Sequence, residues 1–206
     1  MKTIAFVGLI GSGKDTAASY LIEKHEYTKY SFAGTLKDAC ANIFGWDREM
    51  LEGKTPESRE WREQIDEWWA NRLGMPNFSP RYALQYVGTD ILRNRFHQDI
   101  WVLSLQRSLL DSDTRAVISD ARFRNEIVAL RQLGAVIVEV SRGPKPEWWS
   151  VAVGASSGDP ESIDRIREIG IHHSEWDWAS VEPDYVLDNT GTIQDLHNQL
   201  EYLMTR

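Results

Sequence analysis

The hydrophobic positions along the chain follow two periods, one typical of buried strands and one typical of helices. Residues 3–7, TIAFV, form a short apolar run that ends at a glycine and predicts a buried strand. Apolar residues at helical spacing over 17–22 then predict a helix. A second short strand is expected at 28–32, followed by a helix that contains Cys40. The chain therefore opens as strand, glycine loop, helix, strand.

The middle of the chain has the helical period. Residues 57–73 carry Trp61 and Trp68 on one face and charged residues on the other, which predicts one amphipathic helix with these tryptophans in the core. A further helix is expected over 80–96, because Pro80 suits a first helical turn. Another is expected over 99–110.

The C-terminal half returns to alternating strands and helices. Strands are expected at 115–120, 135–140 and 184–189, with a helix between the first two that is closed by Gly134. A final helix carries an apolar stripe from Ile193 onward. This alternation predicts an α/β fold in which helices cover both faces of a parallel sheet. We expect residues 1–206 to form a single domain.

The segment over about 142–178 breaks the alternation. It has no apolar period and carries Gly, Pro and Ser clusters, with one short helix expected at 161–170. A long irregular stretch inside a compact domain is usually a functional lid or a disordered insert. Its Arg165 and Arg167 are either lid arginines over phosphates or partners in surface ion pairs.

Length, composition and charge narrow the class of protein. The 206 residues can bury one core, and no apolar run is long enough to cross a bilayer. The first apolar run ends at Gly-Ser-Gly-Lys-Asp rather than at a cleavage site, which argues against a signal peptide. A single cysteine suits a reducing cytoplasm. The net charge of −8 argues against a nucleic-acid coat protein, whereas sixteen arginines among 23 basic residues suit phosphate binding.

The stretch VGLIGSGKDT, residues 7–16, carries the strongest chemical signal. The phosphate-loop pattern is Gly, four residues, Gly-Lys, then Ser or Thr, and Gly8, Gly13 and Lys14 match it. Such glycines let backbone N–H groups point at phosphate oxygens at a helix N-terminus. A dinucleotide fingerprint needs another glycine spacing and gives Lys14 no role. The expected nucleotide-binding residues are Gly8, Gly11, Ser12, Gly13, Lys14, Asp15 and Thr16.

An acid stands where this pattern expects a hydroxyl. The Asp15 carboxylate would repel a polyphosphate, so we expect it to turn aside while Thr16 supplies a hydroxyl to Mg²⁺. Asp120, at the end of a predicted strand, is the second expected magnesium contact, although a helix cap is an alternative. Arg122 could neutralise a phosphoryl group in transfer, so the expected catalytic residues are Lys14, Asp120 and Arg122. Arg124 fits a solvated helix face equally well.

Six short stretches give the chain a family resemblance. In chain order they are GSGKDT, YSFAGTLKDA, LQYVGTD, SDARFRNE, HHSE and DNTGT. This ordered set resembles the bacteriophage-type deoxynucleoside monophosphate kinases of the P-loop nucleoside monophosphate kinase group, over nearly the whole chain. The resemblance implies a P-loop kinase fold with a five-stranded parallel sheet, a helical acceptor-nucleotide region over about 34–97 and a lid over about 142–178. It also implies Mg²⁺-dependent transfer of the γ-phosphoryl group of ATP to a deoxynucleoside 5′-monophosphate, giving the diphosphate for DNA synthesis.

The resemblance also implies site residues by motif. Lys37 and Arg81 fall where the acceptor's α-phosphate is held, Gln85 faces the base, and Arg93 is a further phosphate ligand. On the donor side it implies Arg142, Asn189, Thr190 and Gly191. The acceptor phosphate is largely dianionic at neutral pH, so the reaction needs positioning and charge neutralisation rather than a general base.

Three functions stay open from the sequence. They are the deoxynucleoside monophosphate kinase, a P-loop kinase of another small phosphorylated acceptor of the dephospho-coenzyme A or phosphomevalonate type, and a non-catalytic nucleotide-binding module. LQYVGTD argues against the second and the full set of arginines against the third. The accepted bases, the sugar preference and the roles of 143–170 and of His172, Ser174 and Glu175 are not defined, and a homodimer is expected only from the family and the tryptophans.

Overall fold

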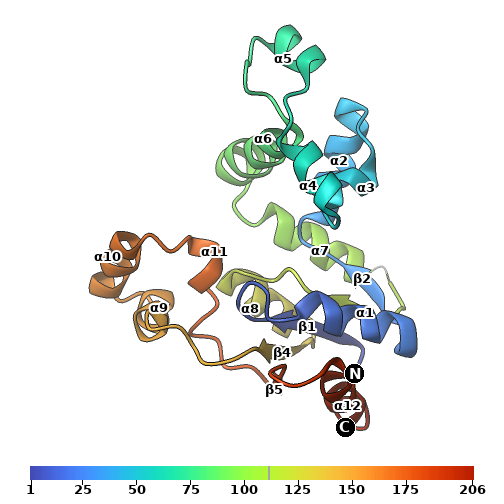
Figure 1. The fold of residues 1–206 in the computed structure, drawn as a ribbon, viewed down its shortest axis with the longest axis vertical. Helices are drawn as coiled ribbons and strands as arrows, with labels where there is room; N and C mark the ends of the chain where they lie inside the picture. Colours follow the sequence, from blue (N-terminus) through green and yellow to red (C-terminus); the bar gives the residue numbers. More distant parts are fainter. Residues whose placement is uncertain (111) are drawn as a thin grey trace. The chain divides into compact units, whose positions relative to one another are not determined.

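The computed structural model describes residues 1–110 and 112–206. The chain divides into two compact units (Figure 1). The first consists of Met1–Ser31 together with Gln106–Arg206, and the second of Phe32–Leu105. Each unit has its own apolar core and is described by itself.

The first unit is built on a five-stranded sheet. Its strands are β1 (Thr3–Val7), β2 (Thr28–Tyr30), β3 (Ala116–Ile118), β4 (Val136–Ser141) and β5 (Tyr185–Asp188). They lie in the order β2-β3-β1-β4-β5, and each neighbouring pair is parallel. All residues of β1 are buried, because this central strand is covered on both faces. The predicted five-stranded parallel sheet is confirmed.

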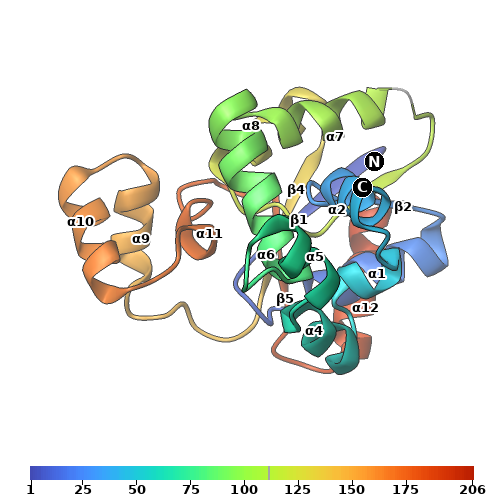
Figure 2. The same ribbon diagram turned by 90° about the horizontal axis from the view of Figure 1, so that it is seen from above.

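Helices cover both faces of this sheet. Figure 2 shows α1 (Lys14–His25) and α12 (Ile193–Met204) on one side of the strands and α8 (Arg124–Gln132) on the other. Leu21 of α1 and Leu200 of α12 share a core cluster with Phe6 of β1. The apolar stripes predicted for α1 and α12 therefore form one layer of the core.

The helical insert, residues 142–178, connects β4 to β5. It contains α9 (Trp149–Ser156), α10 (Pro160–Ile169) and α11 (His173–Trp176), so the expectation of an irregular stretch with a single helix was wrong. Helix α9, WSVAVGAS, is apolar nearly all round and therefore shows no amphipathic period. Its Ala152 packs with Ile166 and Trp176 in a cluster whose buried members all lie in the insert.

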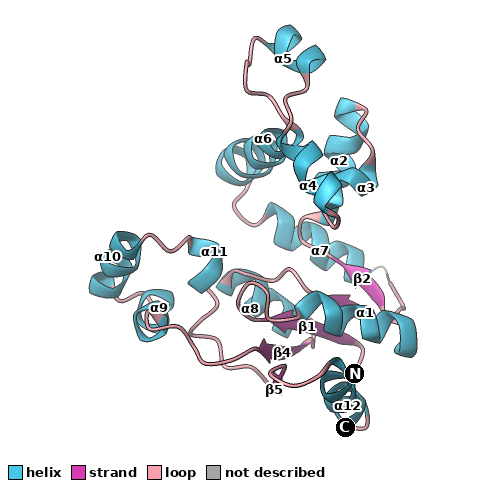
Figure 3. Ribbon diagram, in the orientation of Figure 1, coloured by secondary structure: helices cyan, strands magenta, loops and turns pink. Residues whose placement is uncertain are grey.

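The second unit is formed by short helices and loops (Figure 3). They are α2 (Gly34–Phe44), α3 (Arg48–Glu52), α4 (Pro56–Glu63), α5 (Glu67–Leu73), α6 (Pro80–Gln85), the wider π-helix η1 (Tyr86–Phe96), and the first part of α7 (Ile100–Leu110). Leu36, Cys40, Leu51 and Trp101 form its main core cluster. Helix α7 was expected at this place, and the helix expected over 80–96 is present as α6 followed by η1.

The single helix expected over 57–73 is two helices, α4 and α5. The chain is extended at Gln64, and Asp66 begins α5 by accepting a hydrogen bond from the backbone N–H of Trp69. Trp68 is 58% exposed, so its predicted place in the core was wrong. None of the described helices combines the length and apolar character needed to cross a bilayer.

Candidate nucleotide-binding site

The phosphate loop, residues 8–14, follows the carboxyl end of β1. The neighbours of β1, strands β3 and β4, lie on opposite sides of it, and ligands of open α/β sheets bind at such a point. Gly8, Gly11 and Gly13 have φ values of 147°, 74° and 106°, which favour glycine. A Cβ atom on Gly8 would lie 2.4 Å from the carbonyl oxygen of Val140, so only glycine fits between the loop and β4.

The loop curls around the ammonium group of Lys14. Lys14 Nζ donates to the carbonyl oxygens of Gly8 and Leu9, both at 2.8 Å. Burial lowers the pKa of Lys14, and the charge of Arg122 lowers it further, while Asp15 and Glu175 act in the opposite direction. The charged groups of Arg122 and Glu175 therefore act on the same site as Lys14, although they come from distant parts of the sequence.

Asp15 is directed toward Ser119, which follows β3, and toward Lys29 of β2. Its Oδ1 accepts from the Ser119 hydroxyl at 2.7 Å and lies 3.4 Å from Lys29 Nζ. Desolvation raises the pKa of Asp15, but the Ser119 hydrogen bond and the Lys29 charge lower it by more, so the pKa lies below its usual range. Thr16 lies in the first turn of α1 and is exposed. The Asp15 carboxylate thus has partners of its own on β2 and after β3.

Asp120 and Arg122 lie in the segment that follows β3. Asp120 is half-buried, and its Oδ2 accepts from the Ser31 hydroxyl at 2.7 Å. Arg122 Nη1 lies 3.2 Å from Glu175 Oε1, which belongs to α11 in the helical insert. The guanidinium of Arg124 instead donates to the carbonyl oxygen of Ser156 at 3.3 Å, so Arg124 connects α8 to α9 of the insert.

The loop between β5 and α12 also contacts the phosphate loop. Asn189 Nδ2 donates to the carbonyl oxygen of Ser12 at 2.8 Å, and the Asn189 backbone N–H donates to the carbonyl oxygen of Ser141 at 2.7 Å. Asn189 therefore ties the phosphate loop to β4 and β5. Thr190 and Gly191 follow it as exposed residues.

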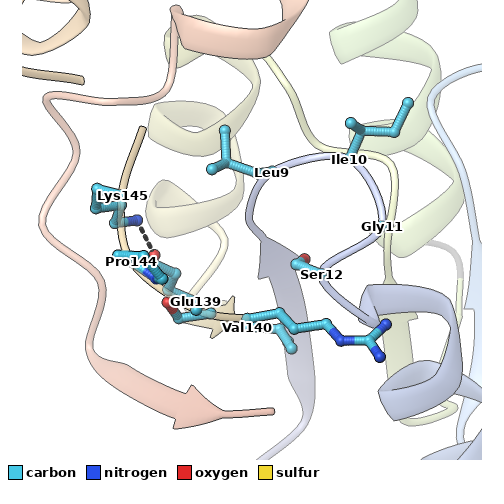
Figure 4. Close-up of a pocket in the computed structure, with 11 residues that line it drawn as sticks. Leu9, Ile10, Gly11, Ser12, Glu139, Val140, Pro144 and Lys145 are labelled. Atoms are coloured by element: carbon cyan, nitrogen blue, oxygen red, sulfur yellow. Dashed lines mark hydrogen bonds and ion pairs between the residues drawn. The ribbon is translucent and has the colours of Figure 1, made fainter. Parts of the chain in front are cut away.

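A cavity of about 210 Å³ opens between the phosphate loop and the end of β4. Its walls come from residues 9–12 and 139–145, which include Arg142. Figure 4 shows Leu9 and Ile10 on the loop side and the hydrogen-bonded pair Lys145 and Glu139 on the strand side. Sequence reasoning missed this pair. The acid in the apolar run AVIVEV was a signal for it, because a buried carboxylate needs a partner.

The acceptor residues predicted from the sequence lie in the second unit. Lys37 Nζ is 2.8 Å from Glu52 Oε2, and both side chains are mostly buried. Arg81 Nη1 is 3.0 Å from Glu63 Oε1. Arg81 and Gln85 are one turn apart on α6 and share a face, while Arg93 lies in η1. Lys37 is thus engaged by a carboxylate.

A further arginine lies near Arg81. Among the described residues, Arg62 Nε is the one buried side-chain nitrogen or oxygen without a hydrogen-bond partner. Burial lowers the pKa of Arg62, and the charges of Arg81 and Arg59 lower it further, so three guanidinium groups influence one another here. Sequence reasoning missed Arg59 and Arg62, because it assigned them to the solvated face of one long helix.

Together these features define the class of protein. A glycine loop at the carboxyl end of the central parallel strand, leading into a helix and closing on a lysine, is characteristic of P-loop nucleotide-binding proteins. The described residues contain the whole loop, together with Asp120 and Arg122 in the segment after β3.

Comparison with known proteins then gives the family. The family model "Deoxynucleotide monophosphate kinase" matches residues 51–148. A protein of Acanthamoeba polyphaga mimivirus, provisionally named a deoxynucleotide monophosphate kinase, is 32% identical over 97% of this chain and 94% of its own length. The deoxynucleotide monophosphate kinase of Enterobacteria phage T4 is 24% identical, with 98% of each chain covered. This chain belongs to the deoxynucleotide monophosphate kinase family, and the family expected from the sequence is confirmed.

Solved structures resemble the chain only loosely. A protein of Thermus thermophilus matches 98% of this chain and 96% of its own with 21% identity and a TM-score of 0.43. That likeness is too distant to bear on the fold, which rests on the observed sheet order.

Proposed function

We propose that this chain transfers the γ-phosphoryl group of ATP to a deoxynucleoside 5′-monophosphate, with Mg²⁺ as the assisting ion. The observation that carries the proposal is the phosphate loop closed around Lys14, with Arg122 near enough to lower the pKa of that lysine. Family membership supports a deoxynucleoside monophosphate as the acceptor.

The phosphate loop would hold the donor. Gly13 precedes α1 without a capping side chain, so the backbone N–H groups at the start of this helix can serve phosphate oxygens. Lys14 would exchange its two carbonyl partners for the β- and γ-phosphates, while Arg142 lies in the wall of the adjoining cavity. Asn189 would keep the loop in place through Ser12.

The residues of this site fit a magnesium ion shared with substrate phosphates. Among the described residues there is no group of three His, Cys, Asp or Glu side chains that could hold a metal. Mg²⁺ in phosphoryl-transfer sites needs only one or two protein oxygens besides phosphates and water. The Thr16 hydroxyl and the Asp120 carboxylate are the oxygens that would serve. When bound, the ion would neutralise charge on the donor phosphates.

The chemistry asks the protein for positioning and positive charge. The acceptor phosphate has a second pKa of about 6 and is mostly a dianion at neutral pH, so it attacks without a general base. Two polyanions must then be brought into line, which costs electrostatic repulsion unless cations offset it. Lys14 and Arg122 supply that charge on the donor side.

The acceptor would bind in the second unit. Arg81 and Gln85 share a face of α6, and the unpartnered Nε of Arg62 is a donor that lacks an acceptor among the described residues. A phosphate oxygen would give that nitrogen its partner, because buried donors are almost always satisfied. Lys37 forms an ion pair with Glu52, and the other N–H donors of its ammonium group would serve the acceptor phosphate.

The cytoplasm and a small-molecule partner fit this proposal. The net charge of −8 disfavours a nucleic-acid partner, and the single cysteine suits a reducing compartment. A homodimer stays a prediction from the family resemblance and the tryptophans.

A substrate panel tests the proposed function. The purified protein with ATP and Mg²⁺ should convert one or more deoxynucleoside monophosphates to diphosphates, and the ribonucleotides, dephospho-coenzyme A and phosphomevalonate serve as competing acceptors. Lys14→Ala should lower kcat by about 100-fold or more, because it removes charge from the transferring group. Lys24→Ala, at an exposed position near the end of α1, is the matched control.

The same panel can overturn the proposal. No turnover of any deoxynucleoside monophosphate by the wild-type protein would end it. Turnover confined to another acceptor would favour the second kinase class, and ATP binding without any turnover would favour a non-catalytic module.

A further inference from the structure

Helix α11 is tied to the segment that carries Arg122. Asp177, which follows α11, accepts from the backbone N–H of Arg124 at 2.7 Å, and His173 Nε2 lies 2.9 Å from the other oxygen of Asp177. The His173 ring contacts Phe123, with 5.4 Å between ring centroids. Two consecutive residues after β3, Phe123 and Arg124, are thus in contact with the segment HHSEWD, to which sequence reasoning gave no role.

Glu175 provides the contact to Arg122 itself. Its Oε1 lies 3.2 Å from Arg122 Nη1, and its side chain is 23% exposed. The indole N–H of Trp178, a buried residue, donates to the Glu175 carbonyl oxygen at 3.1 Å. The backbone N–H of Arg122 donates to Glu126 at 2.9 Å. The backbones of both residues in the ion pair are therefore held by hydrogen bonds to neighbouring side chains.

This ion pair lies within electrostatic reach of the phosphate loop. Arg122 and Glu175 both shift the pKa of Lys14, in opposite directions, after the larger effect of burial. A free arginine side chain has many rotamers, and a fixed ion-pair partner reduces their number before substrate binds. Only one of the five guanidinium N–H donors needs to face Glu175, so the others can serve phosphate oxygens.

We propose that Glu175 is a positioning residue, which holds the Arg122 guanidinium at the phosphate loop for the phosphoryl group in transfer. The proposal rests on the proposed function and deepens it. The same carboxylate places a negative charge near the donor phosphates, so it weakens ATP binding while it favours transfer. Removal of its charge should therefore change binding and catalysis in opposite directions.

The variant Glu175→Gln tests this prediction, because it keeps the shape of the side chain and removes its charge. We expect kcat to fall about 10- to 100-fold, as for a displaced catalytic group. The Kd for ATP, measured by titration without acceptor, should decrease about two- to fivefold, because a negative charge near the donor phosphates is removed. Glu168→Gln, at an exposed position on α10, is the matched control and should leave both values unchanged. A structural role alone would not give opposite changes in kcat and Kd.

A double-variant cycle separates action through Arg122 from an independent effect. Arg122→Lys should lower kcat, and Glu175→Gln on that background should lower it little further, because residues that act as a unit are not additive. Glu175→Asp should restore part of the loss. Wild-type kcat in Glu175→Gln, unchanged or weaker ATP binding in it, or fully additive losses would each overturn the proposal. An inactive wild-type protein would instead overturn the proposed function, so the two failures are distinguishable.

Discussion

Glu52 lies between two cations in the second unit. Its Oε2 is 2.8 Å from Lys37 Nζ and its Oε1 is 2.5 Å from Arg48 Nη1. Burial raises the pKa of Glu52, but the hydrogen bonds and charges of Lys37 and Arg48 outweigh it and lower the pKa from 4.5 to about 2. Because the pKa is lower in the folded chain, the carboxylate stabilises the fold above pH 4.5, and this contribution is lost as the pH falls toward 2.

Glu52→Gln should therefore destabilise the protein in a pH-dependent way. At pH 7 the free energy of unfolding should fall by on the order of 2 to 3 kcal/mol relative to wild type. The difference should shrink between pH 4.5 and pH 2, where wild type loses the same contribution. Urea unfolding at several pH values measures it. Glu49→Gln, whose side chain is 80% exposed, is the control, and a difference that stays constant down to pH 2 would contradict the prediction.

At the scale of single residues, the sequence predicts identities better than partners. Gly8, Gly13 and Lys14 are recognisable because the loop needs those residue types at that spacing. The ion pairs of Lys37 with Glu52 and of Arg122 with Glu175 are not recognisable, because each joins residues that the fold, rather than the local sequence, brings together. The predicted roles of the site residues therefore stay predictions until the variants are measured.

At the scale of elements, helices that depend on local sequence were predicted, whereas features that depend on contacts with distant residues were not. The stripe of α12 is visible in sequence because one of its faces packs on the sheet. The break between α4 and α5 is not visible in the sequence, because Asp66, which caps α5, also accepts from the indole N–H of the distant Trp46 at 2.7 Å. Helix α9 packs against other helices of the insert, so it too lacks a one-sided pattern.

Asp66→Ala tests whether that break is held by Asp66. The change removes the cap of α5 and leaves the Trp46 indole without its acceptor, so the free energy of unfolding should fall by about 1 to 3 kcal/mol. Asp66→Asn keeps a capping oxygen and should cost less than the alanine variant. Chemical unfolding followed by tryptophan fluorescence measures both. Equal stability of the alanine variant and wild type would show that the break has another cause.

At the scale of the whole molecule, the candidate donor and acceptor residues belong to different compact units. The phosphate loop lies in the first unit, whereas Arg62, Arg81 and Gln85 lie in Phe32–Leu105. Each ligand should therefore protect its own unit from hydrogen exchange. A ligand at 100 times its Kd stabilises the bound state by about 2.7 kcal/mol. Amides that exchange only when the binding site opens should then exchange about 100-fold more slowly.

Hydrogen exchange with single ligands measures this separation. A non-hydrolysable ATP analogue with Mg²⁺ should slow exchange over residues 8–16, and a deoxynucleoside monophosphate alone should slow it over α4 and α6. Lys14→Ala should abolish the first effect and leave the second, while Arg81→Ala should do the reverse. The two variants thus act as controls for each other. Protection by the monophosphate only in the first unit would show that the acceptor residues predicted in the second unit do not bind it.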